Sequence, residues 1–98
     1  MSRILHSVFF RLSHEKGSEK EQDFLAAGKA LSDISGVENF KTVQEVSPKN
    51  DFDWGFLMEF ADQDAYDTYN NHPDHVAFVE KRWKREVADF MEIDYLVG

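Results

Sequence analysis

Four side chains have the types and spacing that acid–base chemistry requires: His6, Tyr69, His72 and His75. A neutral imidazole accepts a proton near pH 7, and a phenol can hold or protonate an enolate oxygen. A His/Tyr pair facing an apolar pocket therefore suits proton abstraction beside a carbonyl group, followed by aldol closure. A catalytic metal would need three well-placed ligands, and Pro73 separates His72 from His75. We therefore expect no metal ion and no cofactor.

Each of these side chains also has a structural interpretation. His72 precedes a proline and can cap a helix, and His75 can tie a helix to a strand by a hydrogen bond. Tyr69 can be a core aromatic residue whose hydroxyl finds a partner, and His6 a hydrogen-bonded strand histidine. The two interpretations differ in one respect. Catalysis requires Tyr69 and His75 to converge on an open cavity, whereas a structural pair is packed shut.

Apolar periodicity and capping signals predict the elements that carry these residues. The first half of the chain contains a strand over residues 4–12, a helix from a capping box at residues 18–21 to Gly36, and a strand over residues 37–46. The polar connection between the first strand and the helix contains His14, which we expect to be exposed.

The second half begins with turn residues, so a third strand should return antiparallel to the second. Its predicted features are, in order, a turn over residues 47–51, a strand over 52–60, a helix capped by Asp62, an interruption at His72-Pro73, a further helix and a strand over 91–97. The order β-α-β-β-α-β is that of the ferredoxin-like fold, an α+β class with a four-stranded antiparallel sheet and helices on one face. We interpret residues 1–98 as one domain.

The two faces of the sheet have different predicted roles. Leu5, Phe9 and Leu57 lie on the face that the helices leave open, so we expect two copies to pair these faces in a homodimer. On the covered face, His6 can line a pocket for a small, flat hydrophobic ligand. The predicted apolar wall of that pocket is Val8, Phe10, Trp54, Phe56, Met58 and Phe60, for which core packing is the alternative.

Composition excludes several other functions. The net charge of −8 and the lack of a basic stripe argue against a nucleic-acid partner. No apolar run approaches the ~18 residues of a membrane-spanning helix, so we expect no membrane partner. The absence of cysteine excludes disulfides and thiolate chemistry. The beginning of the chain has no signal-peptide pattern, and we expect a cytoplasmic protein.

Several motifs occur together in this predicted context. They are His6 in the first strand, Ser47-Pro48-Lys49-Asn50-Asp51-Phe52, Glu59-Phe60, Tyr69-Asn70-Asn71-His72-Pro73-Asp74-His75-Val76, and Asp94-Tyr95 in the last strand. In these motifs the chain resembles the stress-responsive dimeric α/β-barrel (Dabb) family over essentially its whole length. The resemblance implies a homodimer whose sheets face each other, with a separate pocket in each subunit between sheet and helices.

The resemblance leaves the activity open, because the family combines stress-associated proteins of unclear role with a few polyketide-cyclase-type enzymes. Our first hypothesis is a homodimer with a stress-related or small-molecule-binding role. The alternative is a cofactor-independent polyketide cyclase or lyase that acts on a carbonyl compound. In cyclase-type relatives the Tyr and the second His of the motif do the chemistry, which maps onto Tyr69 and His75. His6, His72 and the aromatic wall would then position the ligand.

Overall fold

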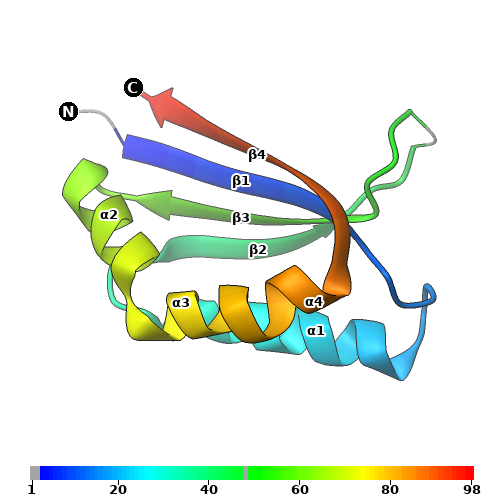
Figure 1. Cartoon of the computed structure of the whole chain (residues 1–98). Helices are drawn as coiled ribbons and strands as arrows, with labels where there is room; N and C mark the ends of the chain where they lie inside the picture. Colours follow the sequence, from blue (N-terminus) through cyan, green and yellow to red (C-terminus); the bar gives the residue numbers. More distant parts are fainter. Residues whose placement is uncertain (1–2, 48) are drawn as a thin grey trace.

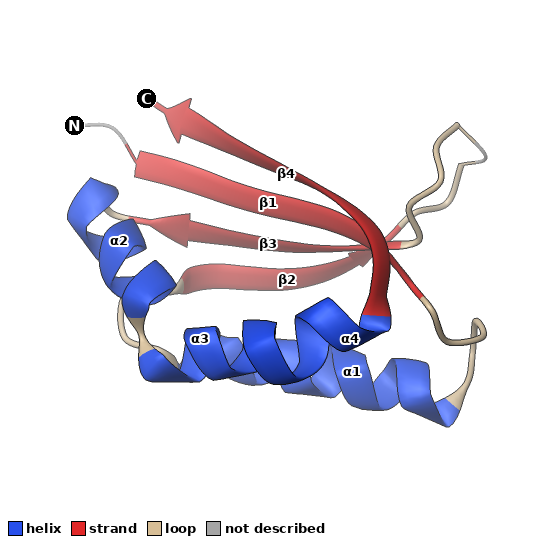
Figure 2. Cartoon of the chain, in the orientation of Figure 1, coloured by secondary structure: helices blue, strands red, loops and turns tan. Residues whose placement is uncertain are grey.

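The chain folds as one four-stranded antiparallel sheet with its helices on one face, as Figures 1 and 2 show. The computed structural model describes residues 3–47 and 49–98, so Pro48 of the predicted turn lies outside the described residues. The elements are β1 (Arg3–Leu12), α1 (Glu19–Lys29), η1 (Ala30–Asp33), β2 (Glu38–Gln44), β3 (Trp54–Phe60), α2 (Gln63–Asn71), α3 (Pro73–Phe78), η2 (Val79–Trp83), α4 (Lys84–Glu86) and β4 (Val87–Val97). The predicted ferredoxin-like order is confirmed.

The sheet has the strand order β2-β3-β1-β4, which places β1 in the interior and β4 at an edge. Antiparallel pairing sets His6 opposite Asp94 and Val8 opposite Glu92. Since side chains alternate along a strand, all four of these residues point to the same face. The strand β4 begins at Val87, four residues before the predicted start at Met91.

The first helix begins where its capping signal predicts. The backbone N–H of Glu21 donates to Ser18 Oγ at 3.2 Å, and the Glu21 carboxylate accepts from the N–H of Gly17 at 2.9 Å. In a standard capping box this carboxylate would accept from the backbone N–H of Ser18. Here it accepts from the N–H one residue earlier in the chain. Its second oxygen accepts from Trp54 Nε1 at 3.0 Å, which joins α1 to β3.

The interruption predicted at His72-Pro73 is also present. Asp62 caps α2 by accepting from the N–H of Ala65, and His72 is both the last cap of α2 and the first cap of α3. The α3 helix then continues into η2, a turn of π-helix that the sequence analysis did not predict. Such turns change the direction in which side chains project, and they are frequent at functional sites.

The hydrophobic core lies between the sheet and the helices. Phe10, Phe24 and Phe56 are at most 1% exposed, and their rings lie in mutual contact range, with Phe10 and Phe56 centroids 4.8 Å apart. The ring of Trp83, from η2, packs edge-on against Phe10 at 5.2 Å. Within the described residues, no helix is long and apolar enough to cross a membrane.

Candidate functional site

A cavity of about 330 Å³ lies between the sheet and the helical layer. Its wall is mainly apolar, and its polar groups come from β1, β4 and the segment around Pro73. The lining residues are His6, Val8, Leu31, Phe56, Met58, Tyr69, Asn70, His75, Phe78, Val79, Trp83, Lys84, Phe90 and Glu92. The structure therefore brings together six of the predicted pocket residues, including both residues that were expected to do the chemistry.

Four residues predicted to bind the ligand lie outside this lining. Phe10 and Phe60 are 0% exposed and belong to the packed core behind it. The indole N–H of Trp54 donates a hydrogen bond to the Glu21 carboxylate. His72 acts as a helix cap, because its Nδ1 accepts from the N–H of Asp74 at 3.0 Å. The structural interpretation of His72 thus describes the contact that this side chain makes.

His75 has the protonation pattern that a general base requires. Its Nδ1 lies 3.1 Å from the backbone oxygen of Asn70. A carbonyl oxygen can only accept, so Nδ1 carries the proton and Nε2 keeps its lone pair. Burial lowers the pKa of His75 more than this hydrogen bond raises it, which favours the neutral ring. Nε2 has no hydrogen-bond partner within residues 3–47 and 49–98.

Tyr69 stands beside His75, with ring centroids 4.4 Å apart. Its side chain is 2% exposed, yet its hydroxyl makes no hydrogen bond to any described residue. No fully buried side-chain nitrogen or oxygen lacks a hydrogen bond in the described part of the chain. The hydroxyl is therefore not fully buried, and Tyr69 is one of the residues that line the cavity. Burial, with a smaller effect of the Glu92 charge, raises the pKa of Tyr69, so the phenol remains a donor.

His6 is held at the cavity wall by three polar partners that the sequence analysis did not identify as site residues. Its Nδ1 lies 2.6 Å from Asp94 Oδ1, 3.1 Å from the Tyr66 hydroxyl and 3.5 Å from Glu92 Oε2. We call His6, Tyr66, Glu92 and Asp94 the His6 cluster. The alternation of β4 places Glu92 and Asp94 on one face, but only the pairing with β1 shows that this face carries His6. Tyr66 gave no signal beyond its place in the predicted helix.

The expectation that the protein uses no metal ion stays a prediction. Among the described residues, one group of three has ligand atoms within 4.8 Å of one another: His6, Glu92 and Asp94. His6 and Asp94 hydrogen bond to each other, and the Tyr66 hydroxyl is within hydrogen-bond distance of all three residues. We therefore interpret the group as a hydrogen-bonded cluster.

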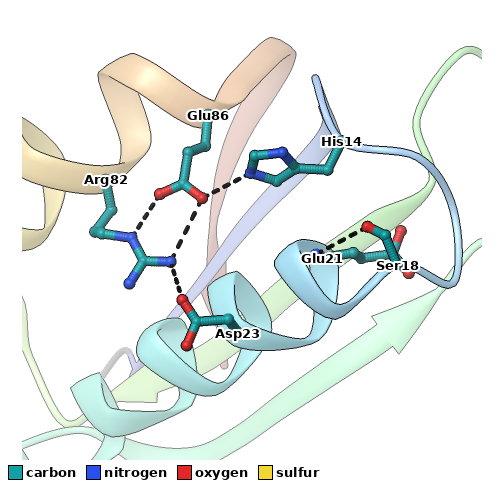
Figure 3. Close-up of polar contacts among 6 residues, drawn as sticks. All are labelled: His14, Ser18, Glu21, Asp23, Arg82 and Glu86. Carbon is teal, nitrogen blue, oxygen red and sulfur yellow. Dashed lines mark hydrogen bonds and ion pairs between the residues drawn. The ribbon is translucent and has the colours of Figure 1, made fainter.

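A second polar network fixes the opposite end of the helical layer (Figure 3). Glu86 accepts from Arg82 and lies 2.7 Å from His14 Nε2, while Arg82 also donates to Asp23 of α1 at 2.8 Å. The expectation that His14 is exposed is therefore wrong, since its side chain is only 18% exposed and is bonded to Glu86.

Comparison with known proteins identifies the fold. The family model of the stress responsive A/B barrel domain (Dabb) matches residues 4–97. A solved structure from Mesorhizobium loti MAFF303099, described as a Dabb family protein with a ferredoxin-like fold, is 52% identical with a TM-score of 0.96. The alignment covers 100% of this chain and 99% of that chain. A search of curated proteins found no match.

Two more distant structures share the fold alone. A dimeric ferredoxin-like protein of unknown function from Thermobifida fusca YX is 18% identical, with a TM-score of 0.81 and coverage of 98% of this chain and 92% of that chain. A hydroxynitrile lyase from Passiflora edulis is 16% identical, with a TM-score of 0.83 and coverage of 98% and 94%. The family match over residues 4–97 and the 52% identity to a Dabb protein show that the chain belongs to the stress-responsive A/B barrel (Dabb) family.

Proposed function

We propose that the cavity binds a small, mainly apolar carbonyl compound and moves a proton on it without a cofactor. The observation that carries this proposal is the convergence of polar atoms without partners. The Tyr69 hydroxyl and Nε2 of His75 have no hydrogen-bond partner among the described residues, and both residues line the same cavity of about 330 Å³. A ligand in this cavity that carries its own polar group could pair with these atoms.

The proposed step uses the two side chains in different roles. Nε2 of His75 takes a proton from the carbon beside the carbonyl group, the C–H bond breaks, and its electron pair forms the C=C bond of an enolate. The Tyr69 hydroxyl donates a hydrogen bond to the enolate oxygen. Its raised pKa means that it binds this oxygen without losing its own proton. The enolate can then close in an aldol reaction or expel a leaving group, as a cyclase or a lyase requires.

The apolar wall supports an aromatic or aliphatic body for the ligand. Phe56, Met58 and Phe78 face the cavity from the sheet and from α3, and Trp83 and Phe90 add two further rings. Apolar walls around the ligand would strengthen the interaction between its oxygen and the Tyr69 hydroxyl. The shared fold with a hydroxynitrile lyase is consistent with lyase chemistry.

We further propose that the protein acts as a homodimer through the open face of the sheet. Structures with this fold are described as dimeric, including the Thermobifida fusca protein. Leu5, Phe9 and Leu57 lie on the open face, where the register adds Ile93 and the half-exposed Met91 and Tyr95 of β4. Pairing two such faces should bury more than about 1,200 Å² in total, as stable interfaces do.

Deuterium exchange tests the proposed chemistry without knowledge of the natural substrate. The protein is incubated with a set of aryl ketones, such as phenylacetone, in D₂O, and the loss of the α-proton signal is followed by NMR. We expect exchange above the buffer rate, a loss of about 10²–10⁴-fold in His75→Ala, and a smaller loss in Tyr69→Phe. The melting temperature and the dimer should change little in both variants.

A matched control is His14→Gln, which removes an imidazole outside the cavity and should leave the exchange rate unchanged. If the ketones bind but do not exchange, the protein is a small-molecule-binding protein without turnover. If His75→Ala lowers stability strongly and neither binding nor exchange occurs with any ketone, His75 is a structural tie and the catalytic proposal is wrong.

A further inference from the structure

The cavity has two ends that differ in chemistry. At the first end the ring of Tyr69 lies 6.2 Å from the ring of His6 and 4.4 Å from the ring of His75. At the second end Trp83 and Phe90 meet edge-on, with ring centroids 5.6 Å apart. The proton transfer proposed above uses the first end alone. The second end is therefore available to bind another part of the ligand.

The two ends are about 13 Å apart, because His6 and Phe10 are four residues apart on one face of β1 and a strand advances about 3.3 Å per residue. Phe10 pairs with Phe90 and packs edge-on against Trp83 at 5.2 Å, which places it at the second end. Opposite the sheet, the helical run from α3 to α4 extends along the strands (Figure 1). A ligand that reaches both ends needs a body of about this length between its polar groups.

Lys84 lines the second end of the cavity. Among the described residues of the lining it alone has an ammonium or guanidinium group, and it directly follows Trp83. In an uninterrupted α-helix the nine residues from His75 to Lys84 would rotate by about 900°, which would put the two side chains on opposite faces. The π-helical turn Val79–Trp83 contains more residues per turn and so reduces this rotation. The π-helical turn thereby brings Lys84 toward the cavity.

The charges at the two ends favour one orientation of an anionic ligand. Glu92, which also lines the cavity, lies 3.5 Å from Nδ1 of His6 and thus at the first end, where its carboxylate disfavours a second negative charge. At the second end Nζ of Lys84 lies 2.7 Å from Glu80, but these two side chains are 60% and 58% exposed. Because an exposed ion pair contributes little to stability, a ligand carboxylate can replace Glu80 at small cost.

We propose that Lys84 is a specificity-determining residue and that the ligand is a keto acid, with its ketone at His75 and its carboxylate at Lys84. This inference rests on the proposed function and names the substrate class of the same cavity. Phe78 and Trp83 line the cavity between these two positions and would contact the apolar body of the ligand. One ammonium group in a chain of net charge −8 suits a monovalent carboxylate better than a more highly charged phosphate.

The test compares two ligands that differ in charge, 4-(3-oxobutyl)benzoate and its methyl ester. Both have a ketone with α-protons, and a benzene ring separates the ketone from the acid or ester group. Isothermal titration calorimetry measures the two dissociation constants. We expect the wild-type protein to bind the acid about three- to fivefold more tightly than the ester. Lys84→Met should remove this preference, because Met keeps an unbranched apolar side chain at the cavity and lacks the ammonium group.

Three further variants separate the position of Lys84 from the overall charge of the protein. Lys81→Met is the matched control, since it removes the same charge from η2 outside the cavity lining and should keep the preference for the acid. Glu80→Gln removes the competing carboxylate and should increase the preference. Lys84→Gln serves if Lys84→Met does not fold.

Equal affinity of the wild-type protein for the acid and the ester overturns the inference, and so does the absence of binding of either ligand. A preference that survives in Lys84→Met, or that is lost equally in Lys84→Met and Lys81→Met, also overturns it. Loss of the preference in Lys84→Met alone supports it.

The proposed proton transfer fails in a different way. His75→Ala should lower the exchange of α-protons yet keep the preference for the acid. A protein that prefers the acid but exchanges no α-proton would have the keto-acid site without the proposed chemistry. A protein that exchanges α-protons of both ligands and binds them equally would have the chemistry without the specificity.

Discussion

Gly28 of α1 lies directly against the ring of Phe56 of β3: a Cβ at residue 28 would be 2.3 Å from Phe56 Cζ. The ring cannot move aside easily, because it is 1% exposed and is flanked by Phe10 and Phe40 at centroid distances of 4.8 and 5.5 Å. Phe56 also lines the cavity. The close approach of α1 to the sheet therefore sets the position of one cavity wall.

We predict that Gly28→Ala lowers the free energy of unfolding by about 1–3 kcal/mol, as overpacking of a core does. Urea denaturation checks the value. The loss should shrink when the same substitution is made in Phe56→Leu, which removes the ring that the new methyl group meets. An equal loss in both backgrounds would mean that the contact with Phe56 is not its cause.

The open face of the sheet provides a prediction about assembly. Phe9→Glu should dissociate or unfold the dimer, because the twofold axis would bring two buried, unpaired carboxylates together. Light scattering at micromolar concentration checks the mass of the particle. Ala26→Glu, on the exposed surface of α1, is the control and should leave the dimer intact. A wild-type protein that is monomeric at 11.4 kDa would contradict the proposed dimer.

Stability should depend on pH through His75. Burial lowers the pKa of this group below its ordinary value of 6.5, so the unfolded chain binds the proton first as the pH falls. The stability linked to His75 is therefore fully present above pH 6.5 and is lost as the pH falls toward the lower pKa of the folded state. The free energy of unfolding should fall less between about pH 7.5 and about pH 5 in His75→Gln than in the wild-type protein. A larger fall in the variant would contradict this direction.

The network around Glu86 should contribute more than an exposed ion pair. The Glu86 side chain is 17% exposed and bonds to both Arg82 and His14, whereas Glu80 pairs with Lys84 in solvent. Glu86→Gln should lower the free energy of unfolding by about 1–3 kcal/mol, since partly buried charged partners lose their acceptor. Glu80→Gln, the matched control, should cost at most about 0.5 kcal/mol. Chemical denaturation distinguishes the two, and equal losses would mean that the network adds nothing specific.

The local features of this fold could be predicted because they depend on residues only a few positions apart. Ser18 and Asp62 cap helices through amides three residues later, and Pro73 excludes the helical conformation at His72. The start of β4 at Val87 and the π-helical turn Val79–Trp83 were not predicted. Both features lie where the packing of Trp83 against Phe10 and Phe24 competes with the conformational preferences of the local sequence.

In the candidate site, too, some features follow from the sequence alone and others only from the tertiary structure. The sequence alone determined that His6, Tyr69 and His75 suit proton transfer and that Glu92 and Asp94 share a strand face, because residue type and alternation are properties of the chain. Tertiary structure decided that Asp94 and Tyr66 meet His6, contacts that span 88 and 60 residues. Such contacts depend on which strands pair and in which register, and that choice is made by the free energy of packing the whole core.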